Sequence, residues 1–176
     1  MDTKEKILLI AFKLFINNGY HNTSMQQLVD NSELSKGAFY HHFKSKNELY
    51  KQVINRYFLS FYKEVDWGNY QKQELTTQQI EKEIQKFYLN FVPQILSITE
   101  NQMSRYYIMY FEAFTLLPEF KKAVQEFYKS LENLLKKATD QTGKSTQIIA
   151  KYEGIIFQIA IHPNLKIKAL LKQVAN

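Results

Sequence analysis

The sequence predicts an all-α protein with a small N-terminal helical domain and a larger C-terminal one. The chain of 176 residues contains only five glycines and three prolines, so long stretches hold no residue that ends a helix. Apolar residues recur at intervals of three and four, which is the helical period. Hydrophobic residues make up 45% of the chain, which is enough to form a buried core.

The first two helices are marked by an apolar stripe and a cap. Residues 3–18 carry apolar side chains on one face, and Gly19 is suited to the left-handed conformation that ends helices. Thr23 to Gln26 matches a capping box. We therefore expect a second helix to begin there and to end near Asn31.

Two serines mark the starts of the next helices. Ser35 is the expected N-cap of a short helix over 36–42. Ser45 with Glu48 forms another capping box, which opens a long helix to about Val65. The chain therefore divides into a three-helix domain and a helical domain, which the long helix joins, at 1–47 and 48–176.

The remaining sequence predicts further helices after a polar loop at 67–77. Pro93 is expected to kink or break the first of them, whereas Pro118 is tolerated in a first turn. The expected bounds are 77–93 with a short continuation to 98, 100–116, 118–139, 146–161 and 165–174, with a loop at 140–145.

Composition excludes several classes of protein. The chain has no cysteine, so disulfides and thiolate chemistry are excluded. The apolar segment 7–16 is interrupted by Lys13 and has helical spacing, so it predicts an amphipathic helix rather than a leader peptide. No apolar run is long enough to span a bilayer. We expect a cytoplasmic protein that does not contact the membrane.

The net charge of +6 lies at the C-terminal end of the chain. Residues 1–50 carry six lysines and five acids, 51–120 seven basic and eight acidic residues, and 121–176 ten lysines and four acids. Bulk charge is therefore weak support for nucleic-acid binding. However, residues 34–46 contain Lys36, Lys44 and Lys46 and no acid.

Three short helices followed by a long one, with a short turn between the second and third, predict a helix-turn-helix domain. The helix over 36–42 would then enter the major groove of DNA. Gly37 would allow that helix to approach DNA closely, or it would only tolerate a tight junction. Phe39 and Phe43 share a face and are expected in the core.

The segment TSMQQLVDNSELSKGAFYHHFKSKNELY, residues 23–50, resembles the DNA-binding signature of TetR-family transcriptional regulators. The most specific part is S-x-G-x-F-Y-x-H-F-x-S-K. Two residues depart from the family pattern: Asp30 occupies a position that is usually alanine, and Glu33 replaces the turn glycine.

The resemblance implies two sets of DNA contacts. The base-contacting residues would be Lys36, Gly37, Ala38 and Gln26. The phosphate-contacting residues would be Thr23, Tyr40, His41, His42 and Lys46. For His42, a phosphate contact and a plain surface position both stay open.

The resemblance also implies that the C-terminal domain binds a ligand and forms a homodimer. Aromatic residues and a methionine at helical spacing would line a pocket, or would be ordinary core: Tyr57, Phe61, Phe87, Phe91, Met103, Tyr107, Tyr110 and Phe114. Apolar residues of the two later helices would form the dimer interface: Phe127, Leu131, Leu134, Tyr152, Ile155, Ile156 and Ile159.

These features predict a sequence-specific DNA-binding regulator, a repressor that a small hydrophobic or aromatic effector releases from a palindromic double-stranded operator. The alternative is a helix-turn-helix protein with an architectural or partner-controlled role and no effector. The sequence has no nucleophile–base pair, metal-ligand cluster or phosphate loop. We therefore expect no enzymatic activity, no cofactor and no metal.

Overall fold

The computed structural model describes residues 2–139 and 143–174, and this part of the chain contains helices and no strand. Internal contacts divide the chain into two compact units. The first unit comprises Met1–Phe61 and Arg105–Lys122, and the second comprises Tyr62–Ser104 and Ala123–Asn176. The all-α prediction is confirmed. The domain boundary after residue 47 stays a prediction, because contacts group the chain differently.

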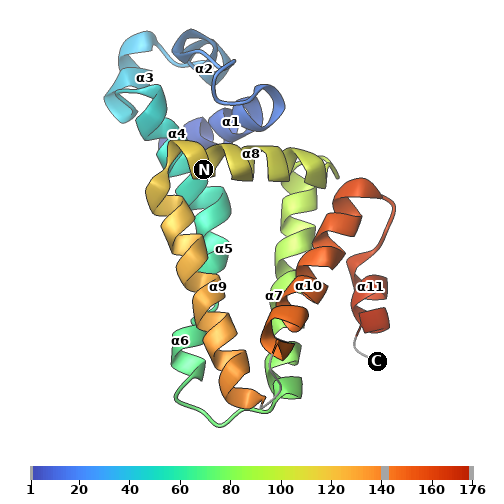
Figure 1. The fold of residues 1–176 in the computed structure, drawn as a ribbon. Helices are drawn as coiled ribbons and strands as arrows, with labels where there is room; N and C mark the ends of the chain where they lie inside the picture. Colours follow the sequence, from blue (N-terminus) through green and yellow to red (C-terminus); the bar gives the residue numbers. More distant parts are fainter. Residues whose placement is uncertain (1, 140–142, 175–176) are drawn as a thin grey trace. The chain divides into compact units, whose positions relative to one another are not determined.

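The first unit contains the N-terminal helices and most of α8 (Figure 1). Its elements are α1 (Thr3–Asn18), α2 (Met25–Ser32), α3 (Lys36–His42), α4 (Lys46–Ile54), the π-helical turn η1 (Asn55–Leu59), the start of α5 (Ser60–Lys63) and α8 (Met103–Leu116). α1 packs against α2 and α4, and α2 packs against α3. α4, η1 and α5 are consecutive, which matches the predicted long helix.

Aromatic rings dominate the core of the first unit. Phe39 and Phe43 are fully buried, as predicted from their spacing. Phe58 stacks on Tyr106 with ring centroids 4.6 Å apart, and Phe12 lies 4.5 Å from Tyr57. Aromatic pairs of this kind stabilise a core by about 0.5–1.5 kcal/mol each beyond the area they bury.

The cap of α2 lies one residue later than predicted. Ser24 is the N-cap, and its side chain and that of Gln27 each accept a backbone N–H bond from the other residue, at 3.1 and 2.7 Å. Thr23 is instead buried, and its hydroxyl donates to the carbonyl oxygen of Gly19 at 2.8 Å. Threonine and serine both suit a capping box, so the sequence pattern fitted two registers.

In the first unit, two described residues that follow helices have positive φ. Gly19 follows α1 with φ 81° and ψ 162°, so its φ is positive as predicted but its ψ is not that of a left-handed helix. Glu33 follows α2 in the left-handed conformation, with φ 59° and ψ 17°. Its carboxylate lies 3.1 Å from the Lys6 ammonium in an exposed ion pair. The position that usually holds glycine therefore keeps the glycine conformation.

The second unit is built from α6 (Trp67–Tyr70), α7 (Thr77–Ile98), most of α9 (Pro118–Ala138), α10 (Lys144–Ile161) and α11 (Ile167–Val174). α10 packs against α7 and α11, and α11 packs against α7 (Figure 1). The part of the predicted 140–145 loop at 140–142 lies outside the described residues. Among described helices, none is long and apolar enough to cross a membrane.

Two predictions about the second unit were wrong. Pro93 does not break α7, which runs unbroken to Ile98. Pro93 and Leu89, whose carbonyl loses its helical partner, are both exposed, so water can bond to that carbonyl. Phe91, Val92 and Ile95 are buried on the other face and hold the helix together. The predicted loop 67–77 also contains a short helix, α6, which Asp66 caps.

Two carboxylates tie α10 to its neighbours in the second unit. Glu153 accepts hydrogen bonds from the hydroxyls of Tyr88 and Tyr128. Glu81 accepts from the Tyr152 hydroxyl at 2.9 Å and pairs with the Lys151 ammonium. Burial, followed by the charge of Glu153, raises the pKa of Tyr88 well above its ordinary value. The phenol therefore stays a hydrogen-bond donor at neutral pH.

The left-handed backbone at Glu33 predicts that Glu33→Gly makes the protein more stable than Glu33→Ala. Both variants lose the exposed Lys6 pair, which contributes about 0.2–1 kcal/mol at most. Only glycine avoids the strain of about 1–2 kcal/mol that a Cβ suffers in this conformation. Part of that gain is lost through the greater freedom of unfolded glycine. We expect the free energy of unfolding, measured with urea, to be higher for the glycine variant. Equal free energies of unfolding for the two variants would show that the backbone at residue 33 is not strained.

Candidate nucleic-acid interface

The start of α3 is exposed. Ser35 caps the helix by accepting from the N–H of Ala38 at 3.2 Å. Lys36, Gly37 and Ala38 are all exposed, whereas Phe39 is fully buried on the opposite face. The inner face of α3 therefore packs on the core, and its exposed face carries one lysine and two residues with little or no side chain.

Gly37 is not required by packing within the chain. A Cβ placed on it would meet no atom within 4 Å, and its φ is not positive. Alanine would therefore fit both the space and the backbone. Glycine costs about 1 kcal/mol in a helix relative to alanine. Its presence at position 37 is therefore best explained by a molecule outside the chain that approaches the helix closely.

Tyr40, His41 and His42 follow the exposed start of α3 along the helix. His41 is exposed, and Tyr40 and His42 are half-buried. The two imidazole rings meet edge to face with centroids 5.4 Å apart. All three side chains carry hydrogen-bond donors that can serve phosphate oxygens.

The two residues around α2 that were predicted to contact DNA differ in exposure. Gln26 is exposed, and its side-chain nitrogen donates to Asp30 Oδ1 at 2.7 Å. Thr23 has no exposed surface, and its hydroxyl bonds inward to Gly19. The Thr23 hydroxyl is therefore occupied within the chain, and a contact between Thr23 and a phosphate stays a prediction.

The Lys46 side chain binds the turn between α1 and α2. Its ammonium donates to the carbonyl oxygens of Tyr20 and Thr23, both at 2.9 Å, and lies 4.3 Å from the centroid of the Tyr20 ring. An ammonium has three donors, so one is left for a phosphate. The main role visible here is to fasten the turn to the start of α4.

Sequence reasoning missed the residue that completes this attachment. Glu112 of α8 accepts the backbone N–H of Tyr20 at 3.0 and 3.1 Å, and the Tyr50 hydroxyl lies 3.4 Å from the same carboxylate. Arg105 donates to Asn17 at the end of α1. Burial and then the charge of Glu112 raise the pKa of Tyr20. No local pattern links residues 92 positions apart.

The residues predicted to line a pocket are distributed over both units. Phe61, Phe87, Phe91, Met103 and Tyr110 are buried, and Tyr57, Tyr107 and Phe114 are half-buried. In the second unit, Phe87 stacks on Phe91 with centroids 5.5 Å apart. None of these side chains lines either of the two cavities described in the second unit. A pocket formed by these eight residues stays a prediction.

The residues predicted to form the dimer interface are buried within a single chain, and their role in a dimer stays a prediction. Every one of them is at most 9% exposed within a single chain: Phe127, Leu131, Leu134, Tyr152, Ile155, Ile156 and Ile159. Their apolar faces form the core of their own unit, because the strongest apolar stripe of an amphipathic helix packs inward. The outer face of α10 carries Ala150, Gly154, Phe157 and Ile161, all exposed.

Comparison with known proteins agrees with this geometry. Residues 7–53 match the model for "Bacterial regulatory proteins, tetR family". The chain is 29% identical over 140 residues to the HTH-type transcriptional regulator QacR of Staphylococcus aureus, covering 77% of this chain and 70% of that protein. It is 28% identical over 161 residues to the uncharacterized HTH-type transcriptional regulator YerO of Bacillus subtilis, covering 88% of this chain but 48% of YerO.

Solved structures share the fold. A transcriptional regulator of the TerR/AcrR family from Aquifex aeolicus aligns with a TM-score of 0.63 and 22% identity, covering 99% of this chain and 96% of that one. A protein from Saccharomonospora viridis in complex with choline aligns with a TM-score of 0.65 and 14% identity, covering 97% and 92% of the two chains. At these identities the likeness concerns the fold alone.

The open space at Gly37 predicts that Gly37→Ala has opposite effects on stability and on DNA binding. The free energy of unfolding is expected to rise by up to about 1 kcal/mol, because alanine favours the helix. Affinity for DNA is expected to fall, because the methyl group occupies the point of closest approach. Urea denaturation and fluorescence anisotropy on one preparation measure both. Unchanged affinity would show that Gly37 only tolerates the junction.

Proposed function

Because the chain belongs to the TetR family of transcriptional regulators, we propose that it binds a palindromic operator as a homodimer and represses transcription until a small molecule releases it. The observation that carries the DNA-binding part is the start of α3. There Lys36, Gly37 and Ala38 are exposed together, in front of the fully buried Phe39 and Phe43. A helix with one face packed on the core and the other face exposed is suited to the major groove.

We assign the contacts in two groups. Lys36 can donate to guanine O6 and N7, and Gln26 can pair with adenine if it leaves Asp30. Gly37 and Ala38 allow the helix to approach base edges and thymine methyl groups. Tyr40, His41, His42 and the third donor of Lys46 serve phosphates, which position the helix and carry no sequence information.

For the homodimer, we propose the outer face of α10 in place of the residues predicted from the sequence. Phe157 and Ile161 are 57% and 51% exposed and lie one turn apart. Gly154 has no atom within 4 Å of an added Cβ, so it would let a partner helix approach closely. A dimer is also needed because two recognition helices must reach major grooves about 34–36 Å apart.

We propose that the effector acts by population shift. A ligand can release DNA only if it binds more tightly to a conformation in which the two recognition helices do not fit successive grooves. Choline bound to a protein of the same fold supports a small-molecule effector. The chemical class of the effector has to be inferred from the residues of this chain.

Selection of bound fragments from a random DNA pool, by the full chain, tests the proposed function. The expected result is enrichment of a site with two-fold symmetry and half-sites about one helical turn apart. If no sequence is enriched although the protein binds DNA at low salt, the regulator reading fails in favour of architectural binding.

The exposed ammonium at the start of α3 predicts distinct effects for two substitutions. Lys36→Ala should weaken binding to the selected site by about 1–3 kcal/mol and relax the preference at one base position. Tyr40→Phe should weaken binding to all sequences alike, because it removes a phosphate donor. Repeating the selection with each variant distinguishes the two. An unchanged base preference in Lys36→Ala would exclude Lys36 as a base reader.

The exposed face of α10 predicts that Phe157→Glu dissociates the dimer. A carboxylate buried against a partner chain without a countercharge is strongly unfavourable. Sedimentation equilibrium should show monomer at concentrations where the parent chain is dimeric. Ile108→Glu is the matched control, since Ile108 is 66% exposed but lies on α8 of the first unit. Dissociation by the control and not by Phe157→Glu would move the interface to α8.

A further inference from the structure

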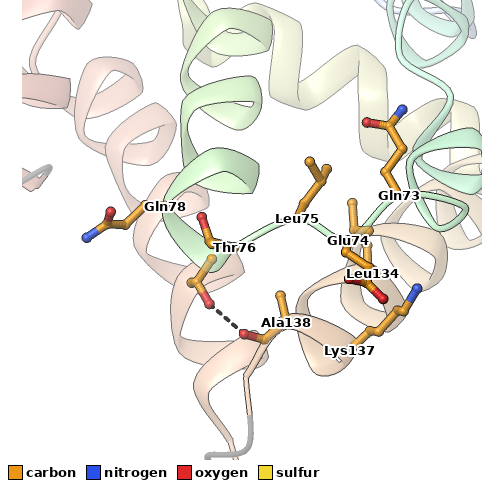
Figure 2. A pocket seen from close by; sticks show the side chains of 9 residues that line it. Gln73, Glu74, Leu75, Thr76, Gln78, Leu134, Lys137 and Ala138 are labelled. Atoms are coloured by element: carbon orange, nitrogen blue, oxygen red, sulfur yellow. Dashed lines mark hydrogen bonds between the residues drawn. The ribbon is translucent and has the colours of Figure 1, made fainter.

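The larger cavity of the second unit has the walls of ordinary solvated helix ends. Its volume is about 800 Å³, and it lies where the chain enters α7 and faces the end of α9 (Figure 2). Two of its polar groups bond to the backbone: the Lys137 ammonium donates to the Gln71 carbonyl, and the Thr77 hydroxyl donates to the Ala138 carbonyl. The feature that the proposed function leaves unexplained lies in the first unit.

The helical run from Lys46 to Lys63 changes its hydrogen bonding at η1. In an α-helix each N–H donates to the carbonyl oxygen four residues back. The N–H of Ser60 instead reaches the carbonyl oxygen of Asn55, five residues back. The Ser60 hydroxyl donates to the Arg56 carbonyl oxygen at 2.7 Å, and so supplies the bond that its N–H would make in an α-helix. Single turns of this kind inside α-helices are found frequently at functional sites.

The core of the first unit does not require the extra residue that this turn contains. Asn55 and Arg56 are exposed, and the Arg56 side chain pairs with Glu5 at 3.2 Å in an exposed ion pair. The buried residues on either side are Ile54 and Phe58, four positions apart. Without one exposed residue they would be three positions apart, and both spacings place two side chains on one helix face. Packing on the core therefore permits an α-helical turn here with one residue fewer.

The turn lies between two anchors of the Tyr20 backbone. Before the turn, Lys46 begins the helical run and donates to the Tyr20 carbonyl oxygen at 2.9 Å. Within the turn, Phe58 stacks on Tyr106 of α8 with ring centroids 4.6 Å apart. The same α8 carries Glu112, which accepts the Tyr20 N–H at 3.0 and 3.1 Å. The distance from Lys46 to Phe58 along the run therefore determines whether both anchors can reach Tyr20.

We propose that the π-helical turn at Asn55–Leu59 is a joint that controls DNA binding. In its present form the joint sets the spacing at which Lys46 and Glu112 hold Tyr20 together, and so it fixes α2 and the exposed start of α3. Helices bend at turns of this kind. Bending, or tightening of the turn to the α-helical form, moves Lys46 relative to α8 and releases one anchor. The effect on DNA rests on the proposed function, whereas the joint and its effect on Tyr20 do not.

Deletion of single residues tests whether the turn is a joint. Without Arg56 the run becomes one continuous α-helix, with Ile54 and Phe58 still in the core, so we expect a cooperative urea transition. Lys51 is the matched control, because it is also exposed and pairs with Glu119 at 2.7 Å, but lies in regular α-helix. Its deletion turns the residues before it by about 100° relative to those after it, so we expect that transition to be lost. If deletion of Arg56 is as damaging, the core requires the turn and the joint is wrong.

Amide hydrogen exchange at Tyr20 tests the link to the anchors without DNA. Deletion of Arg56 shortens the path from Lys46 to Phe58 by about 1.5 Å. The two anchors then no longer meet at one residue. Exchange of the Tyr20 N–H is expected to become about tenfold faster, because it loses a hydrogen bond to the charged Glu112. Arg56→Ala removes the ion pair but keeps the chain length, so it should leave the exchange rate unchanged. Equal rates in the parent chain and the deletion variant would overturn the proposal.

Ser60 allows the same test by substitution. Ser60→Ala removes the hydroxyl from the Arg56 carbonyl oxygen, and this favours the α-helical form, in which the N–H of residue 60 makes that bond. We expect a rate of Tyr20 exchange between those of the parent chain and the deletion variant. Ser60→Thr keeps a hydroxyl that can bond to a carbonyl four residues back, so it should restore the parent rate. If the alanine and threonine variants exchange alike, the hydroxyl does not hold the turn and the joint is wrong.

Binding of the selected operator, measured by DNA retardation, tests the role of the joint in DNA binding. Deletion of Arg56 should weaken binding by about tenfold, which corresponds to the loss of one hydrogen bond to a charged group. Arg56→Ala should not weaken it. Faster Tyr20 exchange with unchanged affinity for the operator would reject control of DNA binding by the joint. Faster exchange in a protein that selects no operator rejects the proposed function and leaves the joint in place.

Discussion

Glu112 and Lys46 hold the backbone of Tyr20 from two sides. The carboxylate accepts its N–H, and the ammonium donates to its carbonyl oxygen and lies over its ring. Tyr20 lies between α1 and α2, so this attachment fixes where α2 begins and, through the packing of α2 on α3, where the exposed face of α3 points. Hydrogen bonds to charged groups contribute about 1.5–3 kcal/mol each, more than neutral ones. α8 is thus part of the unit that positions the DNA-binding helix.

The DNA-binding face combines few charges with small side chains. Lys36 and Lys44 are exposed there, while Lys46 is largely occupied by the Tyr20 turn. Two or three cations give modest general attraction to phosphate, since that attraction grows with the number of neutralised phosphates. Useful affinity then depends on close approach of α3, which Gly37 and Ala38 permit, and on a second copy of the chain. The dimer proposed through α10 would add that copy without any new base contact.

The second unit joins polar networks to an aromatic cavity. Glu153 and Glu81 accept tyrosine hydroxyls and hold α10 to its neighbours. A cavity in the same unit is lined by residues of α6 and α9, among them Trp67 and Phe127.

Local chemistry determined the helices, the caps at Ser35 and Ser45, the buried faces of Phe39 and Phe43, and the exposed start of α3. Each of these depends on residues three or four positions apart, which a sequence displays directly. Only the tertiary structure showed that Ser24 rather than Thr23 caps α2. It also showed that α7 continues past Pro93 and that the apolar residues of α10 are buried within their own unit. It also gave Lys46 two carbonyl partners and brought Glu112 to Tyr20, because contacts between distant residues leave no periodic signal in the chain.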